Sequence, residues 1–145
     1  MTPEEIWSFV TDAPVGILMT LRRDGTPIGL PTWFTCIDGA IYLNTRGKKL
    51  ARVRHDPRAS FLVESGERWA ELKAVHLTGV ADIPALPPDL VERITAEHDR
   101  KYAALTTAAS DMPADTSAVY ASGHAIVRFT PDDRILNWDN SKLGV

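Results

Sequence analysis

Two Asp-Gly pairs, each set between apolar stretches, constrain the fold of this chain more than any other feature. Asp24-Gly25 separates the stretches 15–21 and 27–37, and Asp38-Gly39 separates the second of these from 40–45. The Asp-Gly pair favours a two-residue hairpin turn, because both central residues of that turn need positive φ angles. The sequence therefore predicts three consecutive antiparallel strands that form a meander.

Further strands are predicted in the second half of the chain. Residues 59–64 and 69–83 form apolar stretches that are typical of strands, with turn residues between them. Residues 124–129 and 134–138 have the same character, and Thr130-Pro131-Asp132-Asp133 between them is rich in turn-forming residues. The sequence therefore predicts two more strands and then a closing hairpin.

Three segments have helical patterns. Residues 2–5 combine a Thr cap, a Pro at the first helical position and a Glu three residues after the Thr, which is the signature of a helix start. Residues 47–55 predict one or two turns of surface helix, and 87–105 predict a longer helix with one apolar face. The small and polar residues of 106–117 indicate an irregular connection or a short helix.

Length and composition fit one packed domain that spans residues 1–145. The chain has 145 residues, of which 44% are hydrophobic and 24% are charged. Hairpin connections dominate and no strand-helix-strand crossover repeats, which excludes a doubly wound parallel sheet. About seven short strands need closure to remove their edges. We therefore predict a mainly β protein with peripheral helices, built as a six- to seven-stranded antiparallel barrel; a flat α+β sheet is the alternative.

Charge and cysteine content exclude several functional classes. The net charge of −3 argues against a nucleic-acid partner. No apolar run reaches the roughly 18 residues that span a bilayer, and the acidic start of the chain differs from a secretion signal. We therefore expect a cytoplasmic protein without a membrane partner. The single cysteine, Cys36, excludes an internal disulfide framework and a zinc site built mainly from thiolates.

Basic charge is concentrated in one short block, 46–58, where six cations stand against the single acid Asp56. A block this compact suits a phosphate group better than a nucleic-acid duplex tracked over many phosphates. A solvated basic helix is the other interpretation. The six cations are Arg46, Lys48, Lys49, Arg52, Arg54 and Arg58.

The sequence contains no pattern of catalytic or metal-ligating side chains. Cys36 lies in the apolar stretch 33–37, which predicts a buried, unreactive thiol. The four histidines are scattered, and His98 on the apolar face of 87–105 is expected to be a packed, hydrogen-bonded residue. Glycine-rich phosphate-binding motifs are absent from the sequence. We therefore predict no catalytic side chain and no metal site.

Aromatic residues accompany the basic block, which is the combination that a cofactor with a flat ring and a phosphate requires. The ring needs apolar walls, the phosphate needs cationic or hydroxyl donors, and the cofactor itself performs the difficult chemistry. Packing in the core or in a dimer interface is the alternative role for each tryptophan. The aromatic residues in question are Trp33, Phe34, Trp69 and Trp138.

A series of short motifs occurs in order along nearly the whole chain. The motifs are Ala13-Pro14-Val15-Gly16-Ile17-Leu18, Asp24-Gly25-Thr26-Pro27, Pro31-Thr32-Trp33-Phe34, Tyr42-Leu43-Asn44-Thr45-Arg46-Gly47-Lys48-Lys49, Asp56-Pro57-Arg58-Ala59-Ser60, Gly79-Val80-Ala81 and Asn137-Trp138-Asp139-Asn140-Ser141-Lys142-Leu143. Through these motifs the sequence resembles the split-barrel flavin- and deazaflavin-binding superfamily typified by pyridoxamine 5′-phosphate oxidase.

The resemblance implies a split β-barrel homodimer whose cofactor sites lie in clefts at the subunit interface. Its implied binding residues fall into three groups, at the cofactor phosphate, along the cofactor ring and in the C-terminal tail. They are Lys48 and Lys49, with Thr45 and Arg52 nearby, at the phosphate, Pro31 and Trp33 along the ring, and Trp138 and Lys142 in the tail that closes the cleft.

Within the superfamily, the Pro-Thr-Trp-Phe strand and the Trp-Asp-Asn-Ser-Lys-Leu tail look most like the coenzyme F420 (deazaflavin) oxidoreductases of actinobacteria. The resemblance therefore implies an F420-dependent enzyme that transfers hydride to or from an unsaturated small molecule. Oxidation of pyridoxamine phosphate is not expected, because the chain lacks a C-terminal arginine-rich substrate motif. Two alternatives stay open: an FMN-binding oxidoreductase of the same superfamily, and a non-catalytic cofactor-binding protein.

Overall fold

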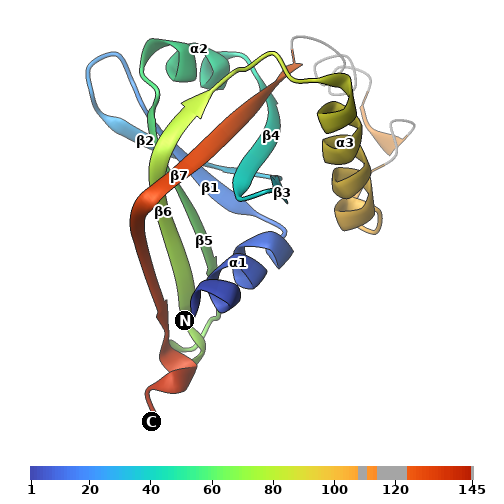
Figure 1. Ribbon diagram of the computed structural model, residues 1–145. Coiled ribbons are helices and arrows are strands. Elements are labelled where there is room, and N and C mark those ends of the chain that lie inside the picture. The colour runs from blue at the N-terminus through green and yellow to red at the C-terminus, as the bar shows by residue number, and fades with distance from the viewer. Residues whose placement is uncertain (108–110, 114–123, 145) are drawn as a thin grey trace.

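The computed structural model describes residues 1–107, 111–113 and 124–144, and within them seven strands form one antiparallel sheet. The strand order is β2-β1-β5-β6-β7-β4-β3 (Figure 1). This mainly β architecture confirms the predicted fold class, and the flat α+β alternative is wrong because the sheet curls into a half-barrel. The strands are β1 (Gly16–Leu21), β2 (Pro27–Thr32), β3 (Thr35–Ile37), β4 (Ala40–Arg46), β5 (Arg58–Ser65), β6 (Lys73–Asp82) and β7 (His124–Asp139).

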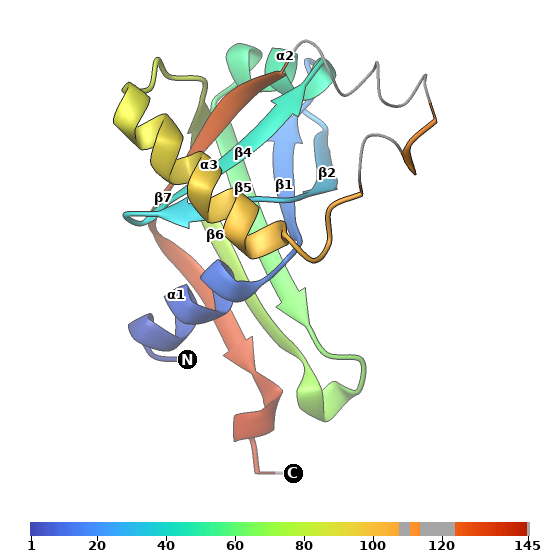
Figure 2. The same ribbon diagram turned by 90° about the vertical axis from the view of Figure 1, so that its right-hand side faces the viewer.

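Three α-helices pack around the sheet (Figure 2): α1 (Pro3–Asp12), α2 (Lys48–His55) and α3 (Pro88–Tyr102). The predicted capping box is present, because the Thr2 hydroxyl accepts from the Glu5 backbone and the Glu5 side chain accepts from the Thr2 backbone. The described residues also include two short 3₁₀ helices, η1 (Trp69–Glu71) and η3 (Asn140–Lys142), which contact each other. No helix in the described part of the chain is long and apolar enough to cross a membrane.

The curl of the sheet comes from a break in the stretch 27–37, which was expected to form one strand. β2 pairs with β1, whereas β3 pairs with β4, so the two strands lie at opposite edges of the sheet and the predicted meander is wrong. Phe34 leaves the sheet because its N–H donates to the Tyr102 hydroxyl and its ring is buried. Because only residues 33–34 join the two edge strands, the sheet must curl to bring its edges together.

The predicted closing hairpin is also wrong, because β7 is one continuous strand. Its first half pairs with β4 and most of its length pairs with β6, so it links the two halves of the sheet. The turn-forming residues 132–134 are accommodated as an irregularity in the pairing with β6. A Cβ atom on Gly79 would lie 2.1 Å from the Thr130 carbonyl oxygen, so a glycine is required at this close approach. The predicted strand 69–83 is likewise shorter, because its first residues form η1.

Candidate functional site

A cleft of about 720 Å³ lies beside the junction of β2 and β3. Its walls come from the end of β2, the end of β4, the first turn of α2, α3 with the segment that follows it, and the start of β7. Four of the eight residues implied by the resemblance line this cleft: Pro31, Trp33, Thr45 and Lys49. The pair Pro31 and Trp33 and the pair Thr45 and Lys49, which come from different segments of the chain, are thus brought to one surface.

One end of the cleft, the basic end, is formed by α2. Lys49 is half-buried there, and burial together with the neighbouring Arg52 lowers the pKa of its ammonium group. Among the residues that the structure describes, no carboxylate forms an ion pair with Lys49. The Arg52 Nε atom is buried and has no hydrogen-bond partner in the same described set. The desolvated Lys49 ammonium group fits an anionic ligand, because a phosphate in the cleft would supply a charged partner.

The basic pair Lys48 and Lys49 does not face one site. Lys48 and Arg52 line a neighbouring groove of about 430 Å³, whose other wall is the β1–β2 turn with Arg22 and Arg23. Lys49 faces the cleft instead. Because Lys49 and Arg52 influence each other electrostatically, the groove and the basic end of the cleft form adjoining positive surfaces.

The other end of the cleft, the aromatic end, is formed by Trp33. Its ring stacks on Tyr102 with centroids 4.2 Å apart and an interplanar angle of 6°. The Tyr102 hydroxyl is buried, lies 2.8 Å from the Pro14 carbonyl oxygen and accepts the Phe34 N–H at 2.9 Å. Burial raises the pKa of Tyr102, so its hydroxyl stays protonated. These contacts fix the Trp33 ring as a rigid apolar wall.

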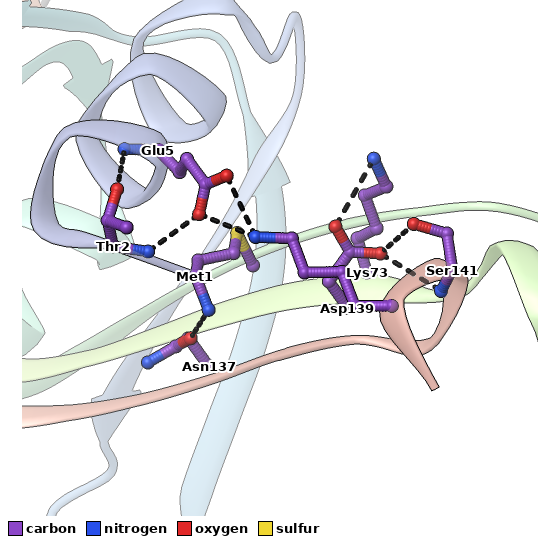
Figure 3. Close-up of polar contacts among 8 residues, drawn as sticks. Met1, Thr2, Glu5, Lys73, Asn137, Asp139 and Ser141 are labelled. Atoms are coloured by element: carbon purple, nitrogen blue, oxygen red, sulfur yellow. Dashed lines mark hydrogen bonds and ion pairs between the residues drawn. The ribbon is translucent and has the colours of Figure 1, made fainter. Parts of the chain in front are cut away.

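The predicted tail residues Trp138 and Lys142 do not line the cleft. Lys142 Nζ lies 2.7 and 2.8 Å from the two Glu5 carboxylate oxygens, in a cluster where α1 meets the C-terminal tail (Figure 3). In the same cluster, Lys73 lies 3.5 Å from Asp139. We call Glu5, Lys73, Asp139 and Lys142 the terminal clasp. Trp138 is 47% exposed. Within one chain, the C-terminal tail lies at the end of the molecule opposite α2 (Figure 1).

Arg46, one of the six cations of the basic block, lines the cleft, and sequence reasoning missed two further side chains that line it, His98 and His124. His98 was expected to be a packed residue, and it is in fact half-buried with part of its ring at the cleft. The only sequence signal was its position four residues before Tyr102, on the helix face that Trp33 covers. Cys36, which was expected to be buried, is partly buried, and burial raises the pKa of its thiol to about 11.

Comparisons with known proteins agree with this architecture. A sequence profile of the pyridoxamine 5′-phosphate oxidase family matches residues 2–133. No curated protein sequence matches the chain. The solved structure of the conserved hypothetical protein Rv2991 from Mycobacterium tuberculosis is 32% identical, with a TM-score of 0.80, over 100% of this chain and 89% of that chain.

Two more distant solved structures share the fold. A heme binding protein from Mycobacterium smegmatis is 22% identical, with a TM-score of 0.68, over 94% of this chain and 57% of that chain. An F420 reductase is 19% identical, with a TM-score of 0.64, over 93% of this chain and 98% of that chain. The profile match covers most of the sequence, and the curled sheet with its cleft agrees with it. The chain thus belongs to the pyridoxamine 5′-phosphate oxidase family of split barrels.

Proposed function

We propose that this protein binds coenzyme F420 in the cleft and transfers hydride to or from an unsaturated small molecule. The observation that carries the proposal is the basic end, where Lys49 is half-buried at the cleft and has no carboxylate partner in the described structure. Lys49 would hold the cofactor phosphate, assisted by Arg52 and by the Thr45 hydroxyl. Each charge-assisted hydrogen bond of this kind contributes about 1.5–3 kcal/mol.

The aromatic end suits the ring of the same cofactor. Trp33 and Pro31 line the cleft at the end away from α2, and the stack on Tyr102 prevents the Trp33 ring from turning. The bound cofactor supplies a two-electron hydride carrier. The task of the chain is then to orient the ring and to exclude water from one of its faces. The family membership and the similarity in fold to an F420 reductase support this assignment.

A second copy of the chain would complete the cleft. Ile17, Leu62, His76 and Leu136 are paired in register across β1, β5, β6 and β7, so they share the outer face of the sheet. This row, which is apolar except for His76, continues to Pro31, which pairs with Ile17 and lines the cleft. Leu136 is 65% exposed. We therefore propose a homodimer that covers this row.

The dimer would also give the C-terminal tail a role in the site. Leu136 and Trp138 are two residues apart in β7, so their side chains lie on the same face of the sheet. Packing of this face against a second copy would place Trp138 and Lys142 near the cleft of that copy. The predicted closure of the cleft by these two residues is then a contribution of one subunit to its partner.

Titration of the cofactor-free protein tests the proposal. Tryptophan fluorescence is recorded with coenzyme F420, FMN and hemin in separate experiments. We expect saturable quenching by F420 that Lys49→Ala weakens about 10- to 100-fold, because the phosphate loses its charged donor. The matched control Lys73→Ala removes a cation that already has a partner and should bind like the wild type.

Other outcomes would change the assignment. Preference for FMN would move the protein to the flavin enzymes, preference for hemin would overturn the hydride-transfer function, and no binding of any ligand would make the basic block a solvated face. Light scattering on the same samples should give twice the chain mass of 16.0 kDa. A monomer in the presence of saturating ligand would contradict the shared site.

A further inference from the structure

The groove between α2 and the β1–β2 turn gathers basic side chains from two segments of the chain. Its volume is about 430 Å³, and no described residue lines both this groove and the cleft. In Figure 1, α2 and the β1–β2 turn lie at the same end of the molecule. Half of the described residues that line the groove are lysine or arginine, and none of them is acidic. The cations are Arg22, Arg23, Lys48 and Arg52.

No carboxylate forms an ion pair with these four cations within the described structure, although seven other lysine and arginine side chains are paired. Asp24 is engaged within the β1–β2 turn, because its Oδ1 atom accepts from the Thr26 N–H at 3.0 Å and from the Thr26 hydroxyl at 2.6 Å. These hydrogen bonds lower the pKa of Asp24 more than the attraction of Arg22 does. Asp56, which follows α2, forms its ion pair with Arg58. The positive charge of the groove is therefore available to a group from outside the chain.

The wall of the groove that α2 provides has a fixed orientation. Leu50 and Val53 are buried in the core and hold the helix against the sheet. The groove-lining residues of α2 follow the first of them at three, four and seven positions, which places them on one face of the helix. They are Lys48, Ala51, Arg52 and His55. Lys49 lines the cleft instead, so two sides of the same helix serve two different spaces.

Backbone hydrogen bonds close the β1–β2 turn, which provides the other wall. The Arg22 N–H donates to the Thr26 carbonyl oxygen, and the Gly25 N–H donates to the Arg22 carbonyl oxygen, each at 2.9 Å. The Arg22 guanidinium also donates to the Pro27 carbonyl oxygen at 3.3 Å. Arg22 and Arg23 are thus presented by a closed turn, which reduces the entropy that a bound ligand would have to overcome.

Arg52 indicates that the groove retains its charge at a cost in stability. Its Nε atom is buried and has no hydrogen-bond partner among the described residues. A buried donor without a partner on a charged side chain lowers the stability of the folded chain. An anion beside the same guanidinium would offset this cost, because it stabilises the charged group as a whole.

The rest of the lining indicates which anion fits. Leu21, Ile28 and Ala51 supply aliphatic surface beside the cations. Apolar walls next to charges of one sign reduce the screening by water and concentrate the electric field. Four cations match the charge of a di- or triphosphate better than that of a single phosphate. Because the described lining contains no tryptophan, tyrosine or phenylalanine, it offers no aromatic surface on which a nucleobase could stack.

We propose that this groove is a second anion site, which binds the di- or triphosphate group of a small molecule independently of the cofactor. Arginine suits this ligand, because its planar fork of N–H donors forms paired hydrogen bonds with phosphate oxygens. The site recognises the polyphosphate itself, so an inorganic polyphosphate and a nucleoside triphosphate bind in the same way. This second site goes beyond the proposed function and does not depend on it.

The groove and the cleft are coupled through Arg52. Burial, and then the charge of Arg52, lower the pKa of Lys49, so the two cations interact across the helix. A polyphosphate in the groove offsets the charge of Arg52 and adds negative charge near the basic end. It therefore weakens the binding of an anionic ligand in the cleft without excluding it, and the effect is reciprocal. Solvent screening limits the expected loss of affinity to about two- to fivefold.

Isothermal titration calorimetry of the cofactor-free protein at low ionic strength tests the site. Sodium tripolyphosphate, ATP and AMP are titrated separately, without divalent cations. We expect tripolyphosphate to bind saturably at one site per chain, and ATP to bind within about threefold of it. AMP should bind at least about tenfold more weakly than ATP, because one phosphate engages fewer of the cations.

Variants on both sides of α2 locate the binding. Arg23→Gln should weaken tripolyphosphate binding about tenfold, since it removes one charged donor, and its melting temperature reports an intact fold. Its affinity for F420 should stay within about threefold of the wild type. Lys49→Ala removes the cation of the cleft, and Arg54→Gln removes an exposed cation of the same helix that lines neither space. Both of these should bind tripolyphosphate within about threefold of the wild type.

Several results would overturn the second site. No saturable binding of tripolyphosphate to the wild type would do so, as would AMP binding as tightly as ATP. Equal losses in Arg23→Gln and Arg54→Gln would mean that net charge attracts the ligand. Complete displacement of tripolyphosphate by saturating F420 would assign the groove to the cofactor site instead. Failure of F420 to bind the wild type is a different result, which overturns the proposed function and leaves the tripolyphosphate titration unchanged.

Discussion

The two clusters of basic side chains in this protein differ in whether the chain itself neutralises them. In the terminal clasp, Lys142 contacts Glu5 and Lys73 contacts Asp139, so each ammonium group has a carboxylate (Figure 3). On α2, Lys49 at the basic end of the cleft has no ion-pair partner among the described residues, and the Arg52 Nε atom beside the neighbouring groove has no hydrogen-bond partner among them. Both clusters contain ordinary lysines, yet only one is complete without a ligand.

This difference in pairing indicates which cluster contributes to stability and which is available to bind a ligand. Exposed ion pairs such as those of the clasp contribute little, because solvent screens them and the side chains lose freedom. An unpaired buried donor or a desolvated cation lowers stability, and a bound anion recovers the loss. The clasp therefore ties the two ends of the chain together, whereas the basic end is prepared for a partner from outside.

The largest effect on F420 binding is expected when a substitution on α2 introduces a carboxylate that can pair with the cations of this helix, as the carboxylates of the clasp pair with its lysines. Lys48→Glu places an acid at the first residue of α2 and four residues before Arg52. The helix dipole and the i,i+4 pair should raise the unfolding free energy by about 0.5 kcal/mol. Removing a cation and adding a competing anion should weaken F420 binding about 100-fold. Denaturant unfolding and fluorescence titration measure the two effects.

The control for this change is Arg54→Glu, which makes the same change of charge on the same helix. Arg54 is exposed and lines neither the cleft nor the neighbouring groove. F420 affinity should stay within about threefold of the wild type, since only a screened long-range interaction changes. Equal loss of affinity in both variants would mean that net charge, rather than the built site, attracts the ligand.

A smaller effect is expected from removal of the unpaired donor. Arg52→Met keeps the length and helix propensity of the side chain but deletes the buried Nε–H. The unfolding free energy should rise by about 1 kcal/mol, while F420 binding weakens. Lys142→Met at the clasp should do the opposite and lower the melting temperature, because it leaves Glu5 without its partner. A lower melting temperature in Arg52→Met would contradict the inference that the unpaired Arg52 Nε atom lowers the stability of the protein.

The smallest effect is expected on the melting temperature at acid pH, and it arises from Glu5 in the terminal clasp. The hydrogen bond from Lys142, and then that from the Thr2 backbone, lower the pKa of Glu5. An acid whose pKa is lowered by folding adds stability above its unfolded pKa of about 4.3, and this is lost as the pH falls through the lower folded value. Glu5→Gln keeps the capping pattern, so its melting temperature should lie below that of the wild type at pH 7 and approach it near pH 3. A constant difference across this range would contradict the assignment.

The local sequence was sufficient to predict those structural features that depend on residues close together in the chain. Asp38-Gly39 forms the predicted two-residue turn between β3 and β4, with positive φ angles at both residues. Asp24-Gly25 also lies in a hairpin connection, between β1 and β2, but there the prediction of a two-residue turn is wrong, because the loop spans residues 22–26 and Gly25 rather than Asp24 has a positive φ angle. The capping box of α1 is also present. In each case, the side chain and the backbone groups that it satisfies lie within three residues of each other.

The errors in the fold came from partners far away in the sequence. Phe34 interrupts an apolar stretch because the hydroxyl of Tyr102, 68 residues later, takes its N–H. Residues 130–133 have the composition of a turn, but Gly79 on the neighbouring strand leaves space for them inside a continuous β7. No local pattern carries this information, because it depends on which strands become neighbours.

The features of the candidate site also divide into those that the sequence predicts and those that only the tertiary structure decides. The concentration of cations in 46–58 and the aromatic Trp33 can be read from the sequence, because charge and ring size are properties of single residues. The tertiary structure decided which of these groups are paired: among the described residues, Lys49 and Arg52 have no carboxylate partner, whereas Lys142 pairs with Glu5. It also brought His98 to the cleft beside Trp33. The sequence determines which charges and rings are available, whereas burial and pairing depend on distances that exist only after the sheet has curled.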